Sequence, residues 1–197
     1  HLLAKLLDHA RVQGLGDSQN VVTERAKPIV LPDEVPAAMR APVTDLVNAI
    51  AEANASIRKA LAPLSESERR LLIDTLPEMA AGSQVKFTFV RPSSAEPKRI
   101  FQLLDKVDLP LIRAASVRLA QAVQDARPKL WAIRSLALPS LLKFTAGGVP
   151  VEIGGAESDE HTSTNAMLCI DLGGRNRYSG RYGAGVAYAS VLIDLGE

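Results

Sequence analysis

Apolar residues recur at helical spacing through much of residues 1–146. The clearest aliphatic stripe consists of Val43, Leu46, Val47, Ile50, Ile57, Leu61 and Leu64. This spacing places the stripe on one face of an amphipathic helix. Between the first residues and this helix, 17–42 form a polar connector whose prolines are predicted to exclude a regular helix. With the further helices described next, residues 1–146 are predicted to form a helical bundle.

Capping residues predict where several of these helices begin and end. Ser65 and Glu68 have the spacing of a capping box, so a helix is predicted to start at this point. Asp108 predicts the start of a longer helix, which Pro128 is predicted to end. A final apolar helix is predicted over 129–144.

Alternating apolar and polar positions, typical of a half-buried strand, are found at 84–90 and three times near the end of the chain. The three later segments are VPVEIGG at 149–155, MLCIDLGG at 167–174 and VLIDLGE at 191–197. The acidic residues at the equivalent, outward-facing position of each segment are Glu152, Asp171 and Asp194. A short strand that recurs every ~20 residues cannot bury its apolar face alone and predicts the start of a parallel β-solenoid. An antiparallel sheet with long loops is the alternative.

Composition also divides the chain near residue 146. Ten of the 13 glycines lie in 147–197, whereas all 12 prolines lie at or before Pro150. We therefore expect an α+β protein, with a helical domain at 1–146 and a glycine-rich β-repeat domain at 147–197 that is incomplete at its C-terminus. The single cysteine, Cys169, excludes a disulfide within the chain, and no motif marks it as a nucleophile.

Charge and hydropathy give little indication of a partner. The formal net charge of +1 gives no bulk reason to expect nucleic acid. No apolar run reaches the roughly 18–20 residues that a transmembrane segment needs. We therefore expect neither nucleic-acid binding nor a membrane span.

Two motifs in the last segments resemble a known repeat. IDLGGRNRYSG at 170–180 and LIDLGE at 192–197 resemble the DLGG-x-D-x-Y repeats of large exported bacterial proteins, and more distantly the calcium-binding β-roll repeats. The resemblance implies a secreted or cell-envelope protein and raises calcium as a ligand. The stretch 173–177 departs from the β-roll pattern, because it carries arginines where that pattern has its ligand aspartate.

Acidic residues supply the candidate metal ligands. The polar loop AESDEHTSTN at 156–165 places His161 beside several carboxylates, and a histidine in such a setting can act as a base or a metal ligand. Equivalent aspartates of two repeats could also form an acidic ladder. The candidate metal ligands are Asp159, Glu160, Asp171 and Asp194. The alternatives are a solvated loop, and aspartates that hydrogen-bond their own turns.

The stretch RNRYSGRY at 175–182 combines arginines with tyrosines. Guanidinium groups and aromatic faces suit sugar rings, carboxylates or phosphates. The candidate ligand-binding residues are Arg175, Arg177, Tyr178, Arg181 and Tyr182. Surface stacking that shields the edge of the repeat is the alternative.

The favoured function is a non-enzymatic binding or scaffold protein of the bacterial cell envelope or exterior. Its expected partner is another polypeptide that completes the β-repeat stack, with a glycan as a second ligand. One alternative is a polysaccharide-acting enzyme, which would need two carboxyl groups roughly 5–10 Å apart across a groove. Another is the leading chain of a proteolytically processed precursor.

Overall fold

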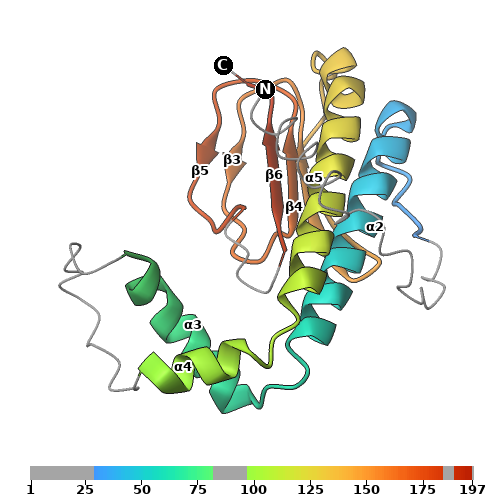
Figure 1. The fold of residues 1–197 in the computed structure, drawn as a ribbon. Coiled ribbons are helices and arrows are strands. Elements are labelled where there is room, and N and C mark those ends of the chain that lie inside the picture. Colours follow the sequence, from blue (N-terminus) through green and yellow to red (C-terminus); the bar gives the residue numbers. More distant parts are fainter. Residues whose placement is uncertain (1–28, 82–96, 184–188, 197) are drawn as a thin grey trace. The chain divides into compact units, whose positions relative to one another are not determined.

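The computed structural model describes residues 29–81, 97–183 and 189–196 (Figure 1). The strand predicted at 84–90 lies outside these residues, as does the part of the predicted connector at 17–28. The chain divides into two compact units. One holds the chain up to Ala55 together with the chain from Arg113 onwards, and the other holds Ser56–Ile112.

The smaller unit contains α3 (Glu66–Ala81) and α4 (Pro97–Leu104). Its core is formed by Leu64, Leu72, Ile100 and Leu103. The predicted capping box is confirmed, because the Ser65 N–H donates to Glu68 Oε2 at 2.8 Å and the Glu68 N–H donates to Ser65 Oγ at 3.3 Å. The start of α3 therefore depends on its own sequence.

The helix α2 (Ala37–Ala60) begins earlier than predicted and runs through Pro42. The predicted end of the connector at residue 42 is therefore wrong. Met39 and Val43, on either side of Pro42, are both fully buried. Their burial in the core outweighs the cost of the hydrogen bond that a proline inside a helix cannot make.

The helix α5 (Leu109–Ala132) begins as predicted, with the Leu111 N–H donating to Asp108 Oδ1 at 2.9 Å. The prediction that Pro128 ends it is wrong, because Pro128 lies inside the helix. Leu130, in the turn that follows, is fully buried, so packing holds the helix together across the proline.

The larger unit contains a four-stranded mixed sheet in the order β1-β2-β4-β6. Its strands are β1 (Leu142–Ala146), β2 (Val149–Gly154), β4 (Leu168–Asp171) and β6 (Val191–Asp194). The hairpin of β1 and β2 is antiparallel, whereas β2, β4 and β6 are parallel. The helix predicted over 129–144 is thus wrong beyond Ala132, because its last residues begin β1. A positive φ at Gly147 and Gly148 makes the hairpin turn.

A second, two-stranded sheet consists of β3 (Glu160–His161) and β5 (Arg177–Tyr178), which are parallel. The predicted fold class, a helical bundle followed by a parallel β-solenoid, is wrong. The described residues form a mixed α+β fold with a small four-stranded sheet and this two-stranded sheet. The physical reason is that helices, and not further coils, cover the apolar face of the three repeated strands.

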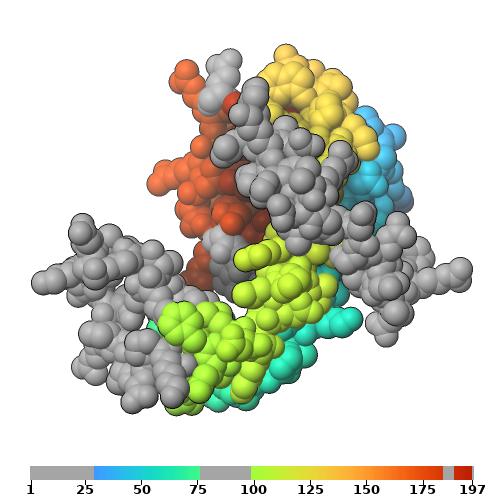
Figure 2. Space-filling model, in the orientation of Figure 1, coloured from blue at the N-terminus to red at the C-terminus, as the bar shows by residue number. Residues whose placement is uncertain are grey.

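One core joins α2, α5 and the four-stranded sheet. Its buried residues include Ile50 of α2, Leu130 of α5, and Ile153 and Ile170 of the sheet. Figure 1 shows the two helices on one side of the sheet and the pair β3–β5 on the other. Figure 2 shows the last turns of α5, in yellow, beside the first turns of α2, in blue. Helices therefore cover one face of the sheet, and the β3–β5 pair covers β2 and β4 on the other face. The candidate functional site lies between the β3–β5 pair and these two strands.

Candidate functional site: a buried histidine between two carboxylates

His161 lies on β3, is 0% exposed and contacts a carboxylate through each ring nitrogen. Nδ1 lies 2.7 Å from Glu152 Oε1, and Nε2 lies 2.6 Å from Asp171 Oδ2. Glu152 belongs to β2 and Asp171 ends β4. The imidazole therefore joins the two sheets through hydrogen bonds at both of its nitrogens.

The strand pleat explains why these groups meet. Glu152, Cys169 and Asp171 alternate with the aliphatic residues that face the helices, so they face the β3–β5 layer. The sequence placed this face outward, toward solvent, and that expectation is wrong. Glu152 is 1% exposed and Asp171 0% exposed, because β3 and β5 cover them.

Glu152 is surrounded by donors. Its Oε1 accepts a hydrogen bond from the Tyr182 hydroxyl at 3.0 Å, and its Oε2 lies 3.4 Å from Lys143 Nζ. A carboxylate with these neighbours is an acceptor for the imidazole. Nδ1 therefore carries a proton and donates a hydrogen bond to Glu152 Oε1, which fixes the orientation of the His161 ring.

Asp171 is in a different environment. Its Oδ1 accepts the Gly173 N–H at 3.0 Å, while its Oδ2 faces His161 Nε2. Burial raises the pKa of Asp171, and the negative charge of Asp194 adds to this effect, whereas the hydrogen bonds from His161 and Gly173 oppose it. The hydrogen bond of 2.6 Å holds one proton between Nε2 and Asp171 Oδ2, and both side chains are 0% exposed.

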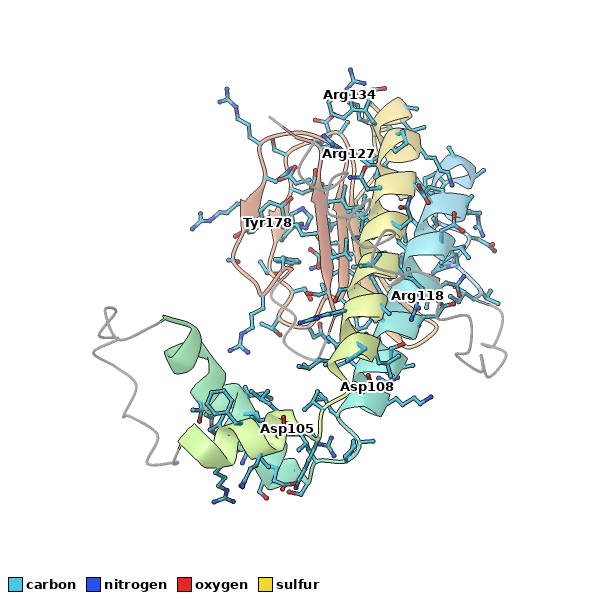
Figure 3. All side chains as sticks on the ribbon, in the orientation of Figure 1. Asp105, Asp108, Arg118, Arg127, Arg134 and Tyr178 are labelled. Atoms are coloured by element: carbon cyan, nitrogen blue, oxygen red, sulfur yellow. The ribbon has the colours of Figure 1, made fainter. Side chains whose placement is uncertain are left out.

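Aromatic rings enclose the imidazole. Tyr178 of β5, labelled in Figure 3, stacks on it with ring centroids 4.6 Å apart, and Tyr182 meets it edge-on at 5.7 Å. Burial raises the pKa of both phenols, so both hydroxyls stay protonated at neutral pH. The two rings cover the imidazole, which is 0% exposed.

Cys169 lies against the same ring, with Sγ 3.7 Å from His161 Nδ1. Burial raises the pKa of the thiol, and the charges of Glu152 and Asp171 add to this effect. A neutral, enclosed thiol is a poor nucleophile. The structure thus gives Cys169 a packing role beside the histidine.

The four candidate metal ligands lie in different environments. Asp159 and Asp171 are brought together at His161, with one ligand atom of each of the three residues within 4.8 Å of the others. Glu160 is exposed and outside this group. Asp194 is exposed, and its Oδ1 accepts the Gly196 N–H of its own turn at 2.9 Å. Asp171 makes the same type of turn bond to Gly173, as the alternative interpretation expected.

The candidate ligand-binding residues divide into two groups. The arginines at 175, 177 and 181 are exposed, whereas Tyr178 and Tyr182 are half-buried against His161. Sequence reasoning missed Glu152 as a histidine partner. The sequence aligned Glu152 with Asp171 as equivalent positions, and this alignment is wrong, because Glu152 lies opposite Cys169 and Asp171 lies opposite Gly154. Both residues are on the same face of the sheet, but the sequence does not reveal which strands cover that face.

No protein-family model, curated protein or solved structure matches this chain. Among the described helices, none has both the length and the apolar character needed to cross a bilayer.

Proposed function

We propose that this chain is a non-enzymatic binding or scaffold protein of the bacterial cell envelope or exterior, and that it binds another polypeptide by strand addition along β6. The observation that carries the proposal is the place of β6 at the end of the sheet. It pairs with β4 on one side and with no other strand that the structure describes. The resemblance of the glycine-aspartate motifs to repeats of exported bacterial proteins supports the location.

The hydrogen-bonding groups of β6 are directed alternately toward β4 and away from it. The Val191 N–H donates to the Met167 carbonyl at 2.7 Å, and the Leu195 N–H donates to the Asp171 carbonyl at 2.9 Å. Because the direction of the backbone groups alternates along a strand, the N–H groups of Leu192 and Asp194 are directed away from β4. Among the residues that the structure describes, none accepts a hydrogen bond from these two N–H groups, so they can pair with an incoming strand.

Side-chain chemistry also favours pairing at β6. Edge strands are usually protected by proline, lysine or a bulge, and β6, with the sequence VLID, has neither proline nor lysine. Leu192 is 39% exposed on it. The opposite edge strand, β1, carries Lys143. The difference makes β6 the better template for β-strand addition.

The face of β6 that bears Leu192 and Asp194 continues the face on which Cys169 and Asp171 are buried. Over β2 and β4, the strands β3 and β5 cover this face, but no strand that the structure describes covers it at β6. A partner strand beside β6, with a following segment beside β5, would bury Leu192. We therefore expect a partner whose strand alternates aliphatic and polar residues.

A strand peptide tests the proposal. The probe is a fluorescein-labelled peptide with the sequence of residues 189–196, ASVLIDLG, titrated with the purified chain and followed by fluorescence anisotropy. Saturable binding is expected. Leu192→Pro removes the outward N–H and is expected to weaken binding at least ~10-fold, because one or two hydrogen bonds and the fit of the edge are lost.

Leu192→Ala is the matched control, since it keeps the N–H and shortens the side chain. It loses only side-chain contact and is expected to weaken binding by less than the proline variant does, and a scrambled peptide is expected not to bind. Equal affinities of the proline and alanine variants would contradict strand addition. So would the absence of any binding by a chain whose circular dichroism shows it to be folded.

A further inference from the structure

The carboxylates of Asp159 and Asp171 lie together beside His161, whose Nε2 is 2.6 Å from Asp171 Oδ2. One ligand atom of each residue lies within 4.8 Å of the other two. These are one imidazole nitrogen and two carboxylate oxygens, a donor set that divalent transition metals accept in proteins. We propose that Asp159, His161 and Asp171 bind a first-row divalent transition-metal ion such as Zn²⁺. This inference is independent of strand addition at β6.

The imidazole is already oriented for a metal. Its Nδ1–H donates to Glu152 at 2.7 Å, which leaves Nε2 as the coordinating nitrogen. A histidine that is held by a carboxylate through one nitrogen and binds metal through the other is a common arrangement at zinc sites. The metal would take the place of the proton now shared by Nε2 and Asp171 Oδ2, which are 2.6 Å apart, and that proton would be released to solvent.

Gly154 shows how closely the two aspartates approach each other. A Cβ at this position would lie 2.5 Å from Asp171 Oδ2 and 2.7 Å from Asp159 Oδ2. Both carboxylate oxygens therefore occupy the space beside the Cα of Gly154, which only a residue without a side chain leaves open. Two carboxylates this close together favour a bound cation.

Solvent access to the site and the types of its donor atoms indicate which ion it would bind. Asp159 is half-buried, so the site has a side that solvent can reach, and three protein ligands leave a fourth position for water. The imidazole nitrogen favours zinc, copper, iron or nickel over calcium, which takes oxygen ligands. A second grouping, Glu152, His161 and Cys169, is fully buried. It would require the ion to take Nδ1, and so to break the hydrogen bond to Glu152.

The test uses the purified full chain after removal of metal with a chelator. Titration calorimetry with ZnCl₂ is expected to show one equivalent bound with a micromolar or lower Kd. Asp159→Asn is expected to weaken binding at least ~10-fold, and Glu152→Gln ~10–100-fold, because the histidine loses its orienting partner. Glu160→Gln is the matched control, since Glu160 is exposed on β3 beside His161, and the affinity of this variant is expected to equal that of the wild type.

The absorption spectrum of bound Co²⁺ distinguishes a site at Asp159, His161 and Asp171 from one at Glu152, His161 and Cys169. With Co²⁺ as the probe, the proposed ligands predict d–d bands without a thiolate-to-cobalt charge-transfer band, and Cys169→Ser is expected to leave the spectrum unchanged. A thiolate band that disappears in Cys169→Ser would overturn the assignment to Asp159 and Asp171. The absence of stoichiometric binding by the folded chain would also overturn it, as would wild-type affinity in Asp159→Asn.

Discussion

At the residue scale, the stability of the fold depends on the hydrogen bonds between His161 and two buried carboxylates, Glu152 and Asp171. Glu152 has further partners in Tyr182 and Lys143, whereas Oδ2 of Asp171 depends on the imidazole. Removing one member of a buried charged group is costly, because the remaining charges have lost their compensation. The side chain of His161 should therefore matter more to stability than its size suggests.

His161→Ala is expected to lower the free energy of unfolding by about 3–5 kcal/mol, because it leaves both carboxylates without the imidazole. Urea denaturation followed by circular dichroism measures this loss. Thr162→Ala, at the next and exposed position, is the control and is expected to change stability by no more than about 0.5 kcal/mol. A loss in His161→Ala as small as that of the control would show that the cluster does not hold the sheets together.

The raised pKa of Asp171 predicts a pH dependence of stability. Burial raises this pKa above its ordinary value of 3.8, so the ionised form is less favourable in the folded than in the unfolded chain. The stabilising contribution is complete below pH 3.8 and is lost as the pH rises through the folded pKa. The titratable groups that face Asp171 are His161, Asp159, Asp194, Cys169 and Tyr178.

Asparagine has no carboxyl group, so the variant Asp171→Asn lacks this pH-dependent contribution to stability. The stability advantage of the wild type over the variant is therefore expected to shrink as the pH rises from about 4 to about 7. Urea midpoints of both proteins across this range measure the trend. The same comparison is made between His161→Gln and the double variant His161→Gln/Asp171→Asn. Neither of these proteins has the imidazole, so any remaining pH dependence comes from the carboxyl group of Asp171. An advantage that grows with pH in that background would contradict the raised pKa.

At the scale of helices and strands, features set by neighbouring residues could be predicted from the sequence, whereas features set by tertiary packing could not. The caps Ser65 and Asp108 could be predicted, because a cap bonds to N–H groups within three residues. The prolines at 42 and 128 misled the prediction, since each stands beside residues that the tertiary core holds in a helix. Strand β3, of two residues, is too short to give a periodic pattern.

The capping box of α3 makes a separate prediction for Glu68. Hydrogen bonds from Lys106, and then from the backbone and hydroxyl of Ser65, lower the pKa of Glu68 from 4.5 to about 2. Its stabilising contribution is therefore present above pH 4.5 and is lost as the pH falls toward 2. Carboxyl ¹³C NMR should find the Glu68 midpoint near pH 2, and Lys106→Met should raise it. A wild-type midpoint near 4.5 would show that the box does not hold the carboxylate in solution.

At the scale of the whole molecule, what covers each face of the sheet decides the site. The alternation in the sequence separates the two faces of β2 and β4, but both faces turn out to be covered, one by α2 and α5 and the other by β3 and β5. The helices at 37–60 and 109–132 are distant from the strands in the sequence and contact them only in the folded chain. For this reason the sequence could place Glu152 and Asp171 on one face, although it aligned them as equivalent whereas the sheet places Glu152 opposite Cys169. Their burial around His161 could not be predicted.

The same arrangement leaves β6 as the last strand of the sheet, and the proposed function depends on this edge. Amide hydrogen exchange by NMR tests it most directly, with the ASVLIDLG peptide as the partner. In the free chain, the amides of Val191 and Leu195, which are bonded toward β4, are expected to exchange slowly, and those of Leu192 and Asp194 quickly. Saturating peptide is expected to protect Leu192 and Asp194. The account is contradicted if these two amides gain no protection with the peptide, or are already as protected as Val191 in the free chain.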